Sequence, residues 1–270
     1  MSDAETHRTQ AIRDTEMATP HRYSIWPKDP AAHLFEVRVT VADPDSQGQV
    51  FAMPAWIPGS YMIRDYAKHV VTARAESDGR DVALEKLDKS RWQAAAADRE
   101  LTLVLEVFAL DESVRGAHLD LTHAFFNGTC VFPAVVGQED IPCKLEIMEP
   151  EKPVGKNWRV ATSMSRNGAD KYGFGSYIAD DYAELIDHPV EVGELSIGEF
   201  EVRGVPHAIA IRGKTRADMA RLCHDLHTIC DHHMSFLGTP GDLDRYLFLL
   251  NAPGSGYGGL EHRWSSALIC

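Results

Sequence analysis

The sequence predicts a β-rich N-terminal domain, an antiparallel sandwich or a curved open sheet, followed by the beginning of an α/β domain. Two observations support this. Before about residue 200, short strand candidates are separated by Gly/Asn/Asp turn signals. After it, the order of elements changes to strand, helix and strand. We place the boundary near residues 190–205, and 270 residues are enough for two ordinary domains.

Strand candidates fill the first part of the chain. Residues 34–41, LFEVRVTV, alternate apolar and polar side chains as a half-buried strand does. Residues 101–110 are apolar on both faces, as in a central strand. Shorter candidates are CKLEIMEP (143–150) and NWRVATSM (157–164), and SDGRD, NGT and RNGAD mark turns between them.

The second part contains one long helix between strand candidates. EFEVRGVPHAIAIRG (199–213) predicts two strands around Gly204, and RYLFLLN (245–251) predicts a buried strand. Residues 214–238 predict a helix, with a capping box of Thr215 and Asp218 at its start and Gly238 at its end. The apolar stripe of this helix consists of Met219, Leu222, Cys223, Leu226, Ile229, Cys230 and Phe236.

Composition and charge exclude some partners. The hydrophobic content of 44% is that of a globular protein, and the net charge of −13 argues against binding to nucleic acid or an anionic membrane. No apolar run is long enough for a membrane helix. Residues 1–20 form a polar, flexible tail without a secretory signal, so we expect a cytoplasmic protein. The odd count of five cysteines agrees with reduced thiols.

The helix also carries a run of potential metal ligands, CHDLHTICDHH (223–233). Cys223 and Cys230 lie on the apolar stripe, where cysteine behaves as a small hydrophobic residue. A four-ligand zinc site needs convergent side chains, usually from two segments. We therefore interpret the run as structural and expect no metal on it.

A second unusual stretch is PAWIPGSYMIRDYAKHV (54–70), the proline segment. Its Pro58-Gly59 pair predicts a turn, and we expect Arg64 and Asp65 to form an ion pair. From the residues alone, a structured turn is favoured over a ligand-binding loop.

The end of the sequence contains GYGGLEH (256–262), the glycine segment. If it is extended, Gly259 and Glu261 share one face, and Gly258, Leu260 and His262 share the other. A carboxylate beside bare backbone could bind a substrate ammonium group, and a peptide could add to the strand edge. Alone, the segment also fits a turn with a solvated acid.

The proline segment, YIADDYAELIDHPVEVG (177–193, the acidic segment) and the glycine segment occur in this order at suitable spacings. Together they closely resemble the glycyl aminopeptidase family of zinc metallopeptidases, which is of the gluzincin type. The resemblance extends over nearly the whole chain from about residue 20. It implies a β-rich domain over 21–198 and, over 199–270, the incomplete N-terminal part of a thermolysin-like catalytic domain.

The resemblance also implies roles for residues of the glycine segment. Glu261 would hold the free amino group of a peptide substrate, and Gly258 and Gly259 would form the backbone platform. His262 matches the family motif, without a role that follows from the sequence. The larger zinc aminopeptidases have Met and Asn where this chain has Leu260 and His262, which argues against membership of that group.

The zinc-binding motif H-E-x-x-H is not in this sequence. None of the thirteen histidines precedes a glutamate, and no two lie four residues apart. We therefore expect zinc in the full-length enzyme, none on this chain, and no hydrolysis by the chain alone. A truncated aminopeptidase that removes small N-terminal residues explains this best. The alternative is a non-catalytic, β-rich module that binds peptide N-termini.

Overall fold

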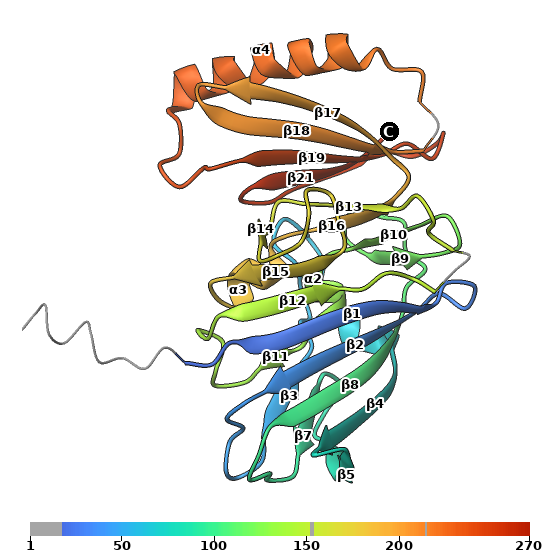
Figure 1. Ribbon diagram of the computed structural model, residues 1–270, viewed down its shortest axis with the longest axis vertical. Coiled ribbons are helices and arrows are strands. Elements are labelled where there is room, and N and C mark those ends of the chain that lie inside the picture. Colours follow the sequence, from blue (N-terminus) through green and yellow to red (C-terminus); the bar gives the residue numbers. More distant parts are fainter. Residues whose placement is uncertain (1–17, 152–153, 214) are drawn as a thin grey trace, which may run out of the picture.

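The computed structural model describes residues 18–151, 154–213 and 215–270. Most of the predicted flexible tail (1–20) lies outside the described residues. The fold confirms the β-rich prediction, because almost all of its elements are strands arranged in four sheets (Figure 1).

The largest sheet has eight strands. In spatial order they are β14 (Ser165–Arg166), β15 (Gly175–Ala179), β12 (Cys143–Ile147), β1 (His21–Asp29), β2 (Leu34–Val41), β8 (Leu101–Phe108), β4 (Val70–Ser77) and β5 (Arg80–Val82). The β1–β12 pair is parallel and the others are antiparallel. In β2 the predicted alternation holds, since every second side chain from Phe35 to Val41 is buried.

Two smaller sheets and three short helices complete the β-rich part. One sheet contains β13 (Arg159–Thr162), β16 (Val190–Gly193), β10 (His123–Phe126) and β9 (Ala117–Leu119). The other contains β11 (Ala134–Val135), β3 (Val50–Ala52), β7 (Arg91–Ala94) and β6 (Leu84–Lys86). The helices are the 3-10 turn η1 (Tyr66–His69), α2 (Gly128–Val131) and α3 (Tyr182–Ile186).

The last part of the chain forms a mixed five-stranded sheet, hereafter the C-terminal sheet. Its order is β17 (Leu195–Val202), β18 (Val205–Arg212), β19 (Tyr246–Asn251), β21 (Ser265–Ile269) and β20 (Gly258–Glu261). Helix α4 (Met219–Leu237) lies over its outer face, and the β-rich part lies beneath its inner face (Figure 1). Leu247, Leu249 and Ala267 on the inner face therefore belong to the main hydrophobic core.

Helix α4 begins and packs differently from the sequence prediction. Its N-cap is Asp218, whose carboxylate accepts a hydrogen bond from the amide of Arg221 at 3.1 Å, so the predicted capping box is wrong. Thr215 instead accepts from the amide of Ala217. Gly238 ends the helix with a φ of 86°, as predicted.

The predicted stripe of α4 is only partly buried. Cys223 packs on Ile209 and Ile211, but Ile229 and Phe236 are 54% and 81% exposed. The stripe prediction is wrong at these two positions because the helix contacts the sheet mainly through β17, and this contact leaves both side chains exposed. Met234, which the prediction left out, is buried instead.

Two expectations about the whole chain can be compared with the fold. All five cysteines are free. Within the described ranges, no helix has both the length and the apolar character needed to cross a membrane.

Candidate functional site

Strand β20 forms one edge of the C-terminal sheet. It pairs with β21 on one side only, in an antiparallel register that places Gly259 opposite Leu268 and Glu261 opposite Ser266. The glycine segment is thus extended at Gly258–Glu261, as the sequence analysis assumed for its face assignment.

The two faces of β20 differ in burial. Leu260 is 1% exposed and belongs to the main core, whereas Glu261 is exposed to solvent. Register places Glu261 on the same face as Ser266 and Phe248, which is the outer face. The predicted alternation therefore holds: Glu261 points away from the β-rich part, and Leu260 points into it.

The backbone of β20 leaves one row of polar groups at the open edge. The amide of His262 donates to the Ser265 carbonyl, so this pair is hydrogen-bonded across the hairpin. Because bonded pairs alternate along antiparallel strands, the amides and carbonyls of Gly259 and Glu261 are directed away from β21. One of them is engaged, since Arg115 Nη2 donates to the Gly259 carbonyl at 3.2 Å.

The proline segment packs against β20 through its turn. Pro58-Gly59 is a turn as predicted, and Gly59 has a φ of 81°. A Cβ at Gly59 would lie 2.6 Å from Leu260 Cδ1, so a larger residue would have to adopt a positive φ and displace this buried side chain. The predicted Arg64–Asp65 ion pair is wrong: Asp65 instead pairs with Lys89 at 2.8 Å.

Arg64 has a different partner, because its Nε donates to Ser60 Oγ at 3.1 Å. Asp65 adopts a left-handed backbone conformation at the start of η1, with a φ of 51°. Arg64 and Asp65 therefore contact different neighbours, although the two residues are adjacent in sequence.

The acidic segment holds the other end of β20. His262 Nδ1 donates to Asp187 Oδ1 at 3.1 Å, and the amide of Arg263 donates to Asp187 Oδ2 at 3.1 Å. Burial raises the pKa of Asp187, but the hydrogen bonds from His262 and Arg263 outweigh it and the pKa is lowered. The ring of Trp264 stacks on His188 with 5.1 Å between the ring centroids.

The three segments singled out in the sequence therefore meet at one strand. The proline segment contacts the middle of β20 and the acidic segment holds its C-terminal end. His262, for which the sequence suggested no role, is the side chain that joins β20 to Asp187. The loop at residues 111–116 is a further support that sequence reasoning missed; it provides Arg115.

Comparison with known proteins identifies the family of the chain. The model of the family "Peptidase M61 N-terminal domain" matches residues 22–194. The chain belongs to the peptidase M61 family. No curated protein matches the sequence.

Solved structures extend the M61 comparison to the C-terminal sheet. A crystal structure of an aminopeptidase N family protein from Idiomarina loihiensis has 40% sequence identity and a TM-score of 0.89, over 93% of this chain and 42% of that one. An M1 zinc metallopeptidase variant from Deinococcus radiodurans has 10% identity and a TM-score of 0.56, over 93% of this chain and 60% of that one. The second likeness concerns the fold alone. The M61 chain thus spans about two fifths of the first structure.

The residues present do not fit a catalytic zinc of the H-E-x-x-H kind, because this motif is not in the sequence. Within the described part of the chain, the cysteines and histidines of α4 form no group of potential metal ligands. A different group does occur between the sheets, at Glu112, His118 and His123. The sequence analysis missed it because no familiar metal motif has this spacing.

Buried ionisable groups surround this second cluster. Burial and the positive charge of Arg212 lower the pKa of His123 to about 3. Burial raises the pKa of Glu191 to about 8. The positive charge of Arg212 lowers this pKa, and the negative charge of Glu112 raises it. The interface between the β-rich part and the C-terminal sheet is therefore polar at this point.

Proposed function

We propose that this chain supplies the substrate-binding strand of a zinc-dependent aminopeptidase that removes small N-terminal residues from peptides. In this proposal the peptide pairs with the open edge of β20, and the Glu261 carboxylate binds its free ammonium group. The observation that carries the proposal is an exposed carboxylate at the end of an edge strand that begins with two glycines.

The chemistry of β20 supports this binding mode. A peptide that adds to a sheet edge needs unpaired amides and carbonyls, and those of Gly259 and Glu261 are directed to that edge. Gly258 and Gly259 have no side chains that would keep the peptide backbone at a distance. A carboxylate at the end of such a strand selects peptides with an unblocked amine through a charge-assisted hydrogen bond.

Supports on several sides keep β20 in place for this task. Arg115 binds the Gly259 carbonyl, Gly59 packs on Leu260, and Asp187 binds His262. An edge strand held by side chains from distant segments loses little freedom when a peptide binds. We infer that these contacts position Glu261, while His262 acts as an anchor and does not touch the substrate.

We further propose that the chain alone does not hydrolyse peptides. The zinc and the general base of such an enzyme need H-E-x-x-H, and the sequence contains none. We also propose two domains and place their boundary between Gly193 and Leu195, a few residues before residue 198. The support for this boundary is that β17 is already part of the C-terminal sheet.

The test is peptide binding to the ¹⁵N-labelled chain, followed by nuclear magnetic resonance. The peptide Gly-Ala-Ala with a free amine should shift the amide signals of Gly259 and Glu261, and its N-acetylated form should not. Glu261→Gln should weaken binding at least tenfold, as expected for loss of about 1.5–3 kcal/mol. Glu201→Gln, an exposed glutamate of the same sheet, is the matched control.

Two results would contradict the role of Glu261: equal binding of both peptides, or unchanged affinity in Glu261→Gln. Cleavage of the peptide by the chain with added zinc would contradict its inactivity but not the role of Glu261. Binding by the intact protein without cleavage would favour the peptide-binding module.

A further inference from the structure

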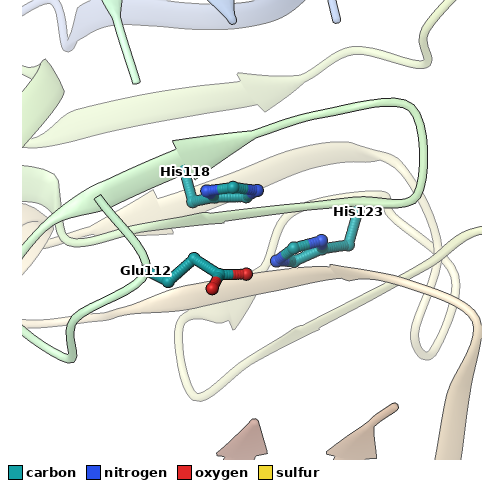
Figure 2. Close-up of side chains that lie close together, drawn as sticks. All are labelled: Glu112, His118 and His123. Atoms are coloured by element: carbon teal, nitrogen blue, oxygen red, sulfur yellow. The ribbon is translucent and has the colours of Figure 1, made fainter. Parts of the chain in front are cut away.

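A cluster of two buried histidines and an exposed glutamate lies between the β-rich part and the C-terminal sheet (Figure 2). Glu112 belongs to the loop after β8, His118 to β9 and His123 to β10. One potential ligand atom from each residue lies within 4.8 Å of the other two. His118 and His123 are only 4% and 1% exposed, and Glu112 is at the surface.

Strand register explains why the two histidines meet. In the β9–β10 hairpin His118 lies opposite Phe125, so His118 and His123 are on the same face at diagonal positions. Phe125 in turn lies opposite Glu191 of β16, which places Glu191 on this face as well. The hairpin sequence HLDLTH thus directs both imidazoles toward the C-terminal sheet.

Asp120, in the turn of the hairpin, faces both imidazoles. Its Oδ1 lies 3.3 Å from His123 Nδ1, and its Oδ2 lies 3.2 Å from His118 Nε2, although neither pair is aligned as a hydrogen bond. His123 Nδ1 is instead 3.1 Å from the Thr122 hydroxyl. Both nitrogens of His118 and Nε2 of His123 are buried and have no hydrogen-bond partner among the described residues. Buried nitrogens without partners are rare unless an ion or water binds them.

The arrangement is that of histidine ligands in metal sites. A histidine that binds a metal through one nitrogen commonly donates the other N–H to a carboxylate, which fixes the ring and its tautomer. Here Asp120 is the carboxylate nearest to both rings, and a small rotation of the imidazoles would align them with it. Glu112 contributes the third group, and its Oε1 is 3.3 Å from Arg212 Nη2, which leaves its second oxygen available.

The charges of the cluster also favour a cation. Glu112 and Asp120 carry two negative charges and Arg212 carries one positive charge, so these three groups have a net charge of −1. A divalent ion is attracted to this negative charge in a partly buried site.

We propose that Glu112, His118 and His123 form a binding site for a divalent transition metal, with zinc as the preferred ion, separate from any catalytic zinc. Two neutral imidazoles and a carboxylate are a ligand set that zinc favours, with water as a fourth ligand. Tetrahedral zinc ligands are about 3.3 Å apart, so the three groups, which lie within 4.8 Å of one another, must approach by up to about 1.5 Å. The imidazoles are stacked at 20°, and one ring must rotate to direct its nitrogen at the shared ion.

The site would link two parts of the fold. Glu112 lies three residues before Arg115, whose side chain binds the Gly259 carbonyl of β20. A metal bound by Glu112 and the β9–β10 hairpin would therefore fix the loop at residues 111–116. We assign it a structural role beneath the peptide-binding edge, and this assignment does not depend on the role of Glu261.

The test is metal binding by the 270-residue chain after removal of metals with a chelator. Zinc should bind with one equivalent per chain, and cobalt(II) should give visible absorption bands that zinc abolishes. Glu112→Gln and His123→Gln should each weaken zinc binding at least tenfold. Glu112→Gln alters an exposed side chain, so the fold should be retained.

The control is the double variant H232Q/H233Q on α4, which should keep the zinc affinity of the natural sequence. X-ray absorption of the zinc-loaded natural chain should show two imidazole ligands and no sulfur, and this needs no variant. The proposal is overturned if the natural chain binds no zinc, if sulfur ligates the ion, or if the α4 variant is the only variant that loses zinc binding.

Discussion

Asp187, the C-cap residue of α3 in the acidic segment, and His262, at the end of the exposed edge strand β20, lie 3.1 Å apart and join the two segments. The same carboxylate accepts from the amide of Arg263, so one side chain fixes two consecutive residues after Glu261. This contact gives His262 a positioning function that its place in the sequence alone does not suggest.

Replacement of Asp187 by Asn should loosen the end of β20. The asparagine oxygen can still accept one hydrogen bond, but the asparagine NH₂ group faces the other donor, either His262 Nδ1–H or the Arg263 amide. The expected loss is about 1–3 kcal/mol of unfolding free energy. Affinity for an unblocked peptide should fall as well, because Glu261 is the neighbour of His262. Urea denaturation and peptide titration measure the two effects, with Asp180→Asn, an exposed residue nearby, as the control. Unchanged peptide affinity in a destabilised Asp187→Asn chain would refute the positioning function.

Gly59 should not tolerate a side chain. Alanine there would adopt a positive φ and place its Cβ 2.6 Å from Leu260 Cδ1, so both strain and steric overlap oppose it. We expect Gly59→Ala to cost about 2–4 kcal/mol in thermal or urea unfolding. Gly79 provides a matched control, because its φ is 71° but no atom lies within 4 Å of its Cβ position. Gly79→Ala should cost only about 1 kcal/mol, and equal losses would show that the Leu260 contact is unimportant.

Much of the strand content could be predicted from local patterns. Alternating burial in β2 and the glycine end of α4 depend on neighbouring residues, so the sequence reveals them directly. The face assignment of β20 was predictable for the same reason, since side chains alternate along any strand.

Contacts between distant segments could not be predicted in this way. The Asp187–His262 contact joins residues 75 positions apart, and Asp65 pairs with Lys89, which follows strands β4 to β6, although Arg64 is adjacent. A separation in sequence gives no distance in space until the sheets are assembled. The His118 and His123 cluster was in part accessible, because a histidine on each side of an Asp-containing turn predicts a shared hairpin face.

Burial along α4 provides a direct test of the stripe that the sequence misassigned. Met234 is 8% exposed and packs with Val202 and Val205, whereas Phe236 is 81% exposed. Met234→Ala should therefore cost about 2–3 kcal/mol, and Phe236→Ala should change stability by less than about 0.5 kcal/mol. Thermal unfolding of both variants checks this. A larger loss for Phe236→Ala would mean that the last turn of α4 is covered in solution.

Glu191 should make stability depend on pH. Its folded pKa of about 8 lies above that of an ordinary glutamate, because the carboxyl is buried and Glu112 repels its charge, while Arg212 opposes the shift. Between about pH 4.5 and 8 the folded chain thus binds more protons than the unfolded chain, and stability falls as pH rises. The Glu191→Gln chain lacks this titration. Its free energy of unfolding, relative to that of the natural chain, should therefore rise by about 2–5 kcal/mol from pH 5 to pH 9. Denaturation in the presence of a chelator, with Glu201→Gln as control, measures the difference. If both chains lose stability equally over this range, then Glu191 is ionised in the folded state, paired with Arg212, and the interface contains a salt bridge in place of a neutral acid.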